Sequence, residues 1–309
     1  MTAEPSVPDG ADGGVVRILH LSDTHFLTVG RHNGVVDTIA ATERVLDACE
    51  QLAPPHLVVV SGDVSDDGSP DSYELARSVV GSWGKEAGAP VVFSMGNHDA
   101  RGPFRSVLGT GHLDVDGGLP PVPDPAPGVP VDALSWVGGL RVVTLDTSVP
   151  GAGRGELDGA QLSWLAGVLA EPAPDGTVLV LHHPPLRPAT RLHEALRLRR
   201  PQELAEVVGG TDVRVMLSGH YHHAMTGVVA GVPAVVTPGV ANRTETLVRY
   251  GTERSVRGSA ATLVELGPGS DLTVTPQVVS HPQDGDPVVH LDAYAVDAFV
   301  RAESSSPAD

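Results

Sequence analysis

Aspartate, asparagine and histidine residues gather at five short stretches of this sequence. The stretches are Asp23-Thr24-His25, Gly62-Asp63, Gly96-Asn97-His98-Asp99, His182-His183 and Gly219-His220-Tyr221-His222. Their side chains offer oxygen and imidazole nitrogen without thiolate, a donor set that suits Mn, Fe, Zn or Co. Seven candidate ligands are more than one ion needs: Asp23, His25, Asp63, Asn97, His182, His220 and His222. The set therefore predicts two metal ions, about 3.5–4 Å apart and bridged by a carboxylate.

Buried strands are the elements that must position these residues. Each stretch directly follows a short, largely apolar run, at residues 15–22, 57–61, 91–95, 177–181 and 213–218. Helical patterns separate the first three runs, at residues 37–52 and from Pro70 onward, where Ser69 is the expected N-cap. This alternation predicts a parallel sheet with crossover helices. Because ligand sites form beyond the carboxyl ends of such strands, we expect the five stretches to converge, with Asp63 as the bridge from a central strand.

The rest of the chain is expected to complete one catalytic domain over residues 15–280. We expect a disordered lead-in at residues 1–14 and a partly disordered C-terminal extension at residues 281–309. A stretch rich in Gly, Pro and Asp predicts a long surface loop at residues 109–130. The remaining patterns predict hairpins at residues 133–147, 224–239 and 260–279, a helix after the N-cap Asp158, and a helix at residues 201–209.

Charge and composition exclude several classes of function. The 309 residues carry a formal net charge of −18, which argues against a protein that grips a nucleic-acid backbone. No run of 18 apolar residues predicts a membrane span, and the acidic N-terminus lacks the apolar run of a signal peptide. Cys49 is the single cysteine, so no intrachain disulfide is possible. These features together predict a cytoplasmic protein.

The order of the five stretches resembles the calcineurin-like metallophosphoesterase superfamily. The stretch "GRGELDGAQLSWLAGVL", followed by "VLHHPP", more narrowly resembles the bacterial class III cyclic nucleotide phosphodiesterases. The resemblance implies an α/β fold, a four-layer α/β/β/α sandwich of two mixed β-sheets flanked by helices, and a homodimer. It implies hydrolysis of small phosphodiesters, above all 3′,5′-cyclic nucleotides. The alternatives are a glycerophosphodiesterase, a broad-specificity phosphatase or 2′,3′-cyclic nucleotide phosphodiesterase, and a scaffold without catalysis.

The same resemblance implies a role for each residue. One metal would be held by Asp23, His25 and His222, the other by Asn97, His182 and His220, with Asp63 bridging. His98 would be a catalytic residue that gives a proton to the leaving alkoxide, and Asp99 would orient His98. Asn97, His98 and His222 would contact the substrate. Fe and Mn are the favoured metal pair, with Zn or Co as alternatives. Asp66 stands where the purple acid phosphatases carry a tyrosine ligand, so a tyrosinate-bound iron is not expected.

Where histidines are adjacent in the sequence, the backbone conformation decides which side chains point toward the site. Side chains at i and i+2 of an extended chain share a face. If the chain stays extended after Ser218, His220 and His222 face the crevice, and Tyr221 and His223 face away. The same logic turns His182 toward the site and His183 away from it. Arg31, His32 and Asn33 follow on a loop expected at the mouth, where both substrate contact and simple exposure remain open.

Overall fold

The computed structural model describes residues 14–119 and 128–305. All but Gly14 of the expected lead-in lies outside the described residues, as do residues 120–127 of the expected loop. In the part of the chain that the structure describes, no helix is long and apolar enough to cross a membrane.

The first sheet carries three of the five polar stretches. At its centre, β1 (Val16–Leu21), β2 (Leu57–Ser61) and β3 (Val91–Ser94) run parallel. Their side chains are almost entirely buried, as expected for strands covered on both faces. Antiparallel strands complete the order β16-β15-β1-β2-β3-β4: β15 (Ser259–Leu266), β16 (Leu272–Val279) and β4 (His112–Leu113).

The second sheet carries the other two polar stretches. Its central strands β6 (Leu140–Leu145), β9 (Thr177–Leu181) and β10 (Val213–Ser218) run parallel, and β12 (Val232–Val236) runs parallel to β10. The predicted hairpins supply the two edges, β5 (Ala133–Val137) beside β6 and β11 (Met225–Val229) beside β12. The order is β11-β12-β10-β9-β6-β5.

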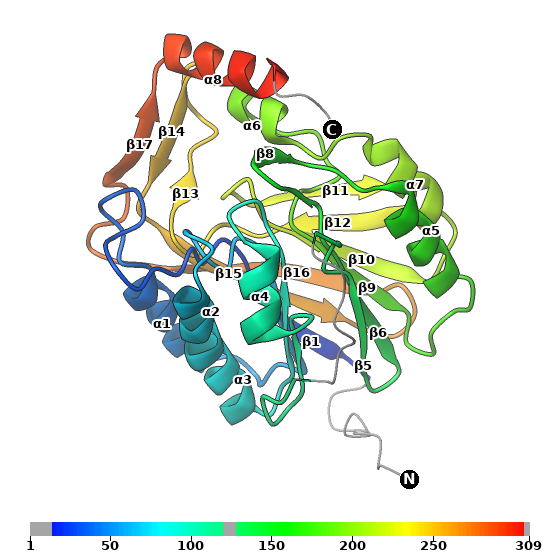
Figure 1. The fold of residues 1–309 in the computed structure, drawn as a ribbon. Helices are drawn as coiled ribbons and strands as arrows, with labels where there is room; N and C mark the ends of the chain where they lie inside the picture. The colour runs from blue at the N-terminus through cyan, green and yellow to red at the C-terminus, as the bar shows by residue number, and fades with distance from the viewer. Residues whose placement is uncertain (1–13, 120–127, 306–309) are drawn as a thin grey trace.

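Helices cover the outer face of each sheet (Figure 1). Beside the first sheet lie α1 (Thr38–Cys49), α2 (Pro70–Ala76), the π-helical turn η1 (Arg77–Gly81), α3 (Ser82–Ala87) and α4 (Arg101–Leu108). Beside the second lie α5 (Gly159–Val168) and α7 (Pro201–Val208). Both predicted N-caps are confirmed: Ser69 accepts a hydrogen bond from the Ser72 N–H, and Asp158 forms a capping box with Gln161.

Three hydrophobic layers hold this arrangement together. One lies between the first sheet and its helices, a second between the two sheets, and a third between the second sheet and α5 and α7. In the middle layer, Ile18 and Val59 of the first sheet pack with Val180 and Leu217 of the second. The predicted four-layer α/β/β/α sandwich is therefore confirmed.

Smaller elements surround the carboxyl ends of the central strands. A third sheet joins β13 (Arg243–Thr244), β14 (Glu253–Val256) and β17 (Pro287–Leu291), and β7 (Ser148–Val149) pairs with β8 (Ala152–Gly155). The last helix, α8 (Ala293–Ser305), packs against α6 (Arg191–Leu196). One expectation was wrong in part: residues 109–130 are not loop throughout, because His112 and Leu113 form β4 against the open edge of β3.

Candidate metal centre

All seven predicted ligands lie in loops that follow the carboxyl ends of β1, β2, β3, β9 and β10. Backbone hydrogen bonds join these loops: the Asp23 N–H donates to the Gly62 carbonyl at 3.1 Å, and the His25 N–H to the Asp63 carbonyl at 2.9 Å. The Asp23 carboxylate also accepts from the His220 N–H, at 3.0 Å to Oδ2, which ties the second sheet to the first. The two sheets therefore share one site.

The backbone of the ligand residues is strained. Five of the eight described non-glycine residues with a positive φ are predicted ligands: Asp23 (54°), His25 (46°), Asp63 (46°), His220 (69°) and His222 (52°). This conformation costs about 1–3 kcal/mol per residue and persists only where the surroundings enforce it. Asp and His tolerate it better than most side chains, so the residues that bind metals also suit the backbone. Strain concentrated in this way is typical of a functional site.

Glycines in the motifs let the ligand loops approach one another. A Cβ at Gly96 would lie 2.3 Å from Asp63 Oδ1, and a Cβ at Gly219 would lie 1.7 Å from Ser22 Oγ and 2.6 Å from Asp23 Oδ2. Any larger residue would push the neighbouring carboxylate away. The glycine that precedes Asn97, and the one that precedes His220, therefore serve packing between loops.

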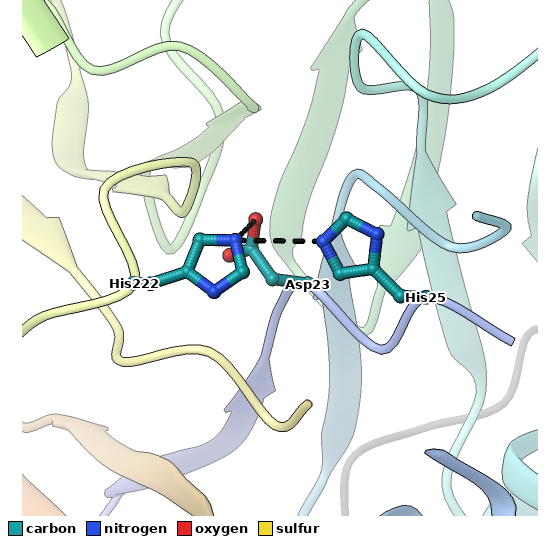
Figure 2. A group of neighbouring side chains, drawn as sticks. All are labelled: Asp23, His25 and His222. Atoms are coloured by element: carbon teal, nitrogen blue, oxygen red, sulfur yellow. Dashed lines mark hydrogen bonds and ion pairs between the residues drawn. The ribbon is translucent and has the colours of Figure 1, made fainter. Parts of the chain in front are cut away.

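The first group of candidate ligands comprises Asp23, His25 and His222 (Figure 2). Their donor atoms lie within 4.8 Å of one another. His222 Nε2 is 3.2 Å from Asp23 Oδ1 and 3.4 Å from His25 Nε2. This is a three-ligand pocket with both nitrogens and the carboxylate turned inward.

The second group comprises Asp63, His182 and His220. Asp63 Oδ2 lies 3.3 Å from His182 Nε2 and 3.7 Å from His25 Nε2, so the same oxygen faces both groups. The other oxygen, Oδ1, accepts the His98 N–H at 2.9 Å. This position between the groups is the one that a bridging carboxylate needs.

In each candidate histidine ligand, one ring nitrogen contacts an oxygen atom outside the ligand groups. His25 Nδ1 contacts Asp66 Oδ1 at 3.0 Å, His182 Nδ1 the Ser61 carbonyl at 2.8 Å, and His222 Nδ1 the Asn242 carbonyl at 3.1 Å. His220 is reversed, since its Nε2 contacts the Leu196 carbonyl at 3.0 Å and leaves Nδ1 toward the site. Such partners fix the tautomer and ring orientation of histidines that ligate metals.

Among the buried side-chain atoms that lack a hydrogen-bond partner in the described residues, two belong to predicted ligands of the second metal. They are His182 Nε2 and Asn97 Oδ1. A buried polar atom without a partner is costly, and a bound cation is one physical reason to keep it. The residues present therefore fit two metal ions.

The electrostatics of the site also favour a cation. Burial disfavours the charged form of His182, but the charges of Asp63 and Asp23 outweigh burial and raise its pKa to about 9. Burial opposes ionisation of Asp23, but His222 and His182 lower its pKa to about 2. The same balance holds the pKa of Asp63 well below its ordinary value. The carboxylates are thus ionised and attract positive charge, which a metal supplies once it displaces the protons.

His98 stands at the rim of the site. Its side chain is 41% exposed, whereas those of His25 and His182 are buried. Its ring lies edge-on to His25, with centroids 4.7 Å apart. Burial lowers the pKa of His98, but the charges of Asp63 and Asp66 outweigh it and raise that pKa above its ordinary value. His98 is therefore suited to meet a substrate and to carry a proton to it.

The partner predicted to orient His98 differs in the structure. The Asp99 carboxylate accepts the N–H groups of Val64, Ser65 and Gly96 at 3.1, 2.9 and 2.8 Å, and so holds the loop that carries Asp63. His98 Nδ1 lies instead against Asp66, 3.3 Å from its carbonyl and 3.5 Å from Oδ1. The physical reason is that three backbone N–H groups, one from its own loop and two from the loop after β2, already occupy both oxygens of the Asp99 carboxylate.

Sequence reasoning missed the role of Asp66. Its Oδ1 lies 3.0 Å from His25 Nδ1 and 2.9 Å from His32 Nδ1, in addition to its contacts with His98. His32 Nε2 then contacts Asn242 Oδ1 at 3.2 Å. Asp66 therefore organises three histidines. Its place three residues after Asp63 was the available signal, but only the tertiary structure brings residues 25, 32 and 98 to it.

The geometry assumed for residues 218–223 was also wrong. The chain does not stay extended, because His220 and His222 have left-handed φ values. They reach different ligand groups through this turn. Tyr221 is buried, with its hydroxyl donating to the Leu186 carbonyl at 3.2 Å, and His223 Nδ1 lies by the Ala224 carbonyl. The ring of His183 is held by the Thr147 hydroxyl at 2.8 Å and the Gly153 carbonyl at 3.1 Å, away from the carboxylates.

Comparison with known proteins decides the family. The profile of the calcineurin-like phosphoesterases matches residues 16–224. The chain belongs to this family. It is similar to a probable cyclic nucleotide phosphodiesterase of Rhodococcus erythropolis, with 37% identity over 88% of this chain and 86% of the relative. It is also similar to a cAMP/cGMP dual specificity phosphodiesterase of Mycobacterium tuberculosis, with 36% identity over 78% of this chain and 73% of the relative.

A solved structure shows the same fold as this chain. A dimetal phosphatase from Danio rerio superposes with a TM-score of 0.55 at 14% identity, over 86% of this chain and 99% of that one. At this identity the likeness concerns the fold alone. It agrees with the two packed sheets and the flanking helices described above.

Proposed function

We propose that this protein is a dinuclear metal-dependent phosphodiesterase that hydrolyses 3′,5′-cyclic nucleotides, with cAMP giving 5′-AMP. The observation that carries the proposal is the position of Asp63 Oδ2, which faces both groups of candidate ligands. Beside it stands the partly exposed imidazole of His98. The names of the two bacterial relatives favour cyclic nucleotides over other diesters.

Two bound metal ions would polarise the phosphoryl group and make an activated water available near neutral pH. Asp23, His25 and His222 would hold one ion, and Asn97, His182 and His220 the other, with Asp63 between them. Fe and Mn are the proposed pair. The residue at position 66 is an aspartate that binds His25 and His32, so no tyrosinate joins this set.

His98 would protonate the leaving alkoxide. Asp66 contacts Nδ1 of the ring, so Nε2 is the nitrogen that can reach a substrate. The negative charges of Asp63 and Asp66 favour the protonated imidazole, which is the form that a general acid requires. Asn97 directly precedes His98, and His222 belongs to the first ligand group, so both would contact the phosphate.

A substrate panel tests the proposal directly. With Mn²⁺ added, we expect hydrolysis of cAMP and of bis-p-nitrophenyl phosphate, with the monoester p-nitrophenyl phosphate much slower. The panel should include 2′,3′-cyclic nucleotides and glycerophosphodiesters. Preference for the monoester would contradict the proposal, preference for glycerophosphodiesters would support that alternative, and no hydrolysis of any ester would favour a non-catalytic scaffold.

The bridging role of Asp63 has its own test. We expect Asp63→Ala to lose both ions, because one carboxylate oxygen faces both ligand groups. Metal analysis of the purified variant after equilibration with Mn²⁺ checks this. Two ions per chain in the variant would exclude the bridge.

The homodimer and the cytoplasmic location also stay proposals. Support for the dimer comes only from the resemblance to dimeric enzymes, and sedimentation analysis tests it. Support for the cytoplasm comes from the composition, and fractionation of cells that produce the protein tests it.

A further inference from the structure

A second polar hollow adjoins the metal centre, and none of the predicted ligands lines it. It encloses about 160 Å³ between α1, the loop before it, and the connections on either side of β15 and β16. Three arginines line it: Arg31, Arg44 and Arg257. Their convergence is notable in a chain with 38 acidic and 20 basic residues, where most cations could find a carboxylate.

The carboxylates of this hollow do not neutralise all three arginines. Asp37 accepts the Ala40 N–H as the N-cap of α1 and lies 3.7 Å from Arg31. Asp284 accepts the His281 N–H at 2.8 Å within its own turn. In the described part of the chain, neither Arg44 nor Arg257 has a carboxylate within ion-pair distance.

The hydrogen bonds of these two arginines are also incomplete. Arg44 donates from Nη1 to the Ala40 carbonyl at 3.2 Å, but its buried Nε has no partner among the described residues. Arg257 donates from Nη2 to the Val35 carbonyl. A guanidinium has five N–H groups in a fork that matches the oxygens of phosphate, so several donors here remain for a ligand.

We propose that this hollow binds a small phosphate-type dianion, held by the guanidinium groups of Arg44 and Arg257 with Arg31 beside them. Charge-assisted hydrogen bonds of this kind are the strong ones, and planar arginine forks recognise tetrahedral oxyanions. The N–H groups at the start of α1 add positive potential on the same side.

The hollow adjoins the metal centre without sharing its ligands. Ala241 lines it, and the Ala241 N–H donates to the carbonyl of Asp23 at 3.1 Å. Val36 also lines it and pairs with His32, whose ring contacts Asp66. A phosphate that binds at the metal centre must therefore be distinguished from one in the hollow.

Calorimetric titration of the Mn²⁺-loaded protein with inorganic phosphate tests the proposal. We expect Arg44→Gln/Arg257→Gln to lose one phosphate site per chain relative to the unaltered protein, and Arg44→Gln alone to weaken that site about tenfold or more. Arg249→Gln, at an exposed position outside the hollow, should leave binding unchanged. Equal stoichiometry and affinity in the double variant and the unaltered protein would overturn the proposal.

Two further measurements complete the test. One distinguishes free phosphate from a phosphomonoester, and the other shows that a variant that loses binding is still folded. Titration with 5′-AMP shows whether a phosphomonoester reaches the same site, which distinguishes it from free phosphate. Arg44→Gln removes one solvent-exposed hydrogen bond, to the Ala40 carbonyl, so the midpoint of thermal unfolding should stay the same. If this folded variant binds phosphate as the unaltered protein does, the site does not exist. Hydrolysis of bis-p-nitrophenyl phosphate, measured in parallel, reports separately on the metal centre.

Discussion

At the residue scale, Asp66 and His98 divide the work that the motif alone assigned to His98 and Asp99. Asp66 Oδ1 lies within 3.5 Å of ring nitrogens of His25, His32 and His98. One carboxylate thus sets the direction of a candidate ligand and of the candidate acid. Asp99 instead fixes the backbone around Asp63. We therefore propose that Asp66 couples metal binding by His25 to proton transfer by His98.

His98→Ala isolates proton transfer from metal binding. Because the imidazole lies at the rim and the His98 backbone N–H still reaches Asp63, we expect the variant to keep two metal ions. Turnover of cAMP should fall by about 10²–10⁴, the usual range for loss of a general acid. Metal analysis and steady-state kinetics check both parts, and turnover equal to that of the unaltered protein would remove His98 from the mechanism.

Asp66→Asn tests the coupling. The amide has the shape of the carboxylate but no charge, so His25 loses its charged partner, and we expect about 10- to 100-fold weaker metal binding. Competition with a chelator measures that affinity. Asp47→Asn, at an exposed position on α1, is the matched control. If both variants bind metal equally well, Asp66 does not orient the ligands.

At the element scale, the site depends on how closely loops from the two sheets approach. The loop after β10 reaches the loop after β1 through Gly219, whose hydrogen atom faces Ser22 and Asp23. The left-handed turns at His220 and His222 then aim two side chains in different directions. Strand order delivers the loops, and these glycines and turns decide what each loop presents.

Gly219→Ala should therefore damage the first ligand group. A methyl group would lie 1.7 Å from Ser22 Oγ and 2.6 Å from Asp23 Oδ2, so Asp23 must move. We expect reduced metal content and at least about 1–3 kcal/mol lower stability, the usual cost of overpacking. Gly167→Ala, exposed in α5 with open space around it, should be neutral or slightly stabilising. Similar metal content and unfolding midpoints in the two variants would contradict this account.

At the scale of the whole molecule, two sheets must keep a fixed position for one site to exist. Besides the middle hydrophobic layer, His112 joins them. From β4 of the first sheet, its Nδ1 contacts Ser135 Oγ at 2.6 Å and its Nε2 contacts Thr144 Oγ1 at 3.0 Å, both in the second sheet. This neutral, buried bridge is sensitive to protonation.

The stability of the fold should fall in mild acid because of His112. Burial lowers its pKa to about 4 in the folded protein, from an ordinary value of 6.5. Between those values the unfolded chain binds a proton that the folded one excludes, so the stabilisation is complete above the higher value and is lost as pH falls toward 4. From pH 7.5 to 5.5 we expect a loss of about 1 kcal/mol from this residue.

Urea unfolding of His112→Gln at the two pH values measures this contribution. The variant should lose less stability on acidification than the unaltered protein, by about the same 1 kcal/mol. His290→Gln, at an exposed position, should lose as much stability between the two pH values as the unaltered protein does. Parallel losses in all three proteins would show that His112 does not titrate in this way.

The sequence by itself determined the elements and the donor set. Apolar runs followed by polar stretches predicted the five central strands, and Ser69 and Asp158 predicted where two helices begin. Both predictions succeeded because the spacing of apolar residues and helix capping depend on neighbouring residues in the sequence. The motif order indicated the family and the two packed sheets. The seven candidate ligands were named from residue type and strand-end position alone.

Only the tertiary structure decided what holds those ligands in place. The partners of Asp66 lie 41, 34 and 32 residues away along the chain, and no local pattern links them. At the turn after β10, the His220 N–H donates to Asp23 of the first sheet's loop, and His222 Nδ1 contacts the Asn242 carbonyl beyond β12. The pairing of β4 with β3 and the arginine-lined hollow likewise bring together segments that are distant in sequence. Such contacts depend on how sheets pack, and packing is a property of the whole chain.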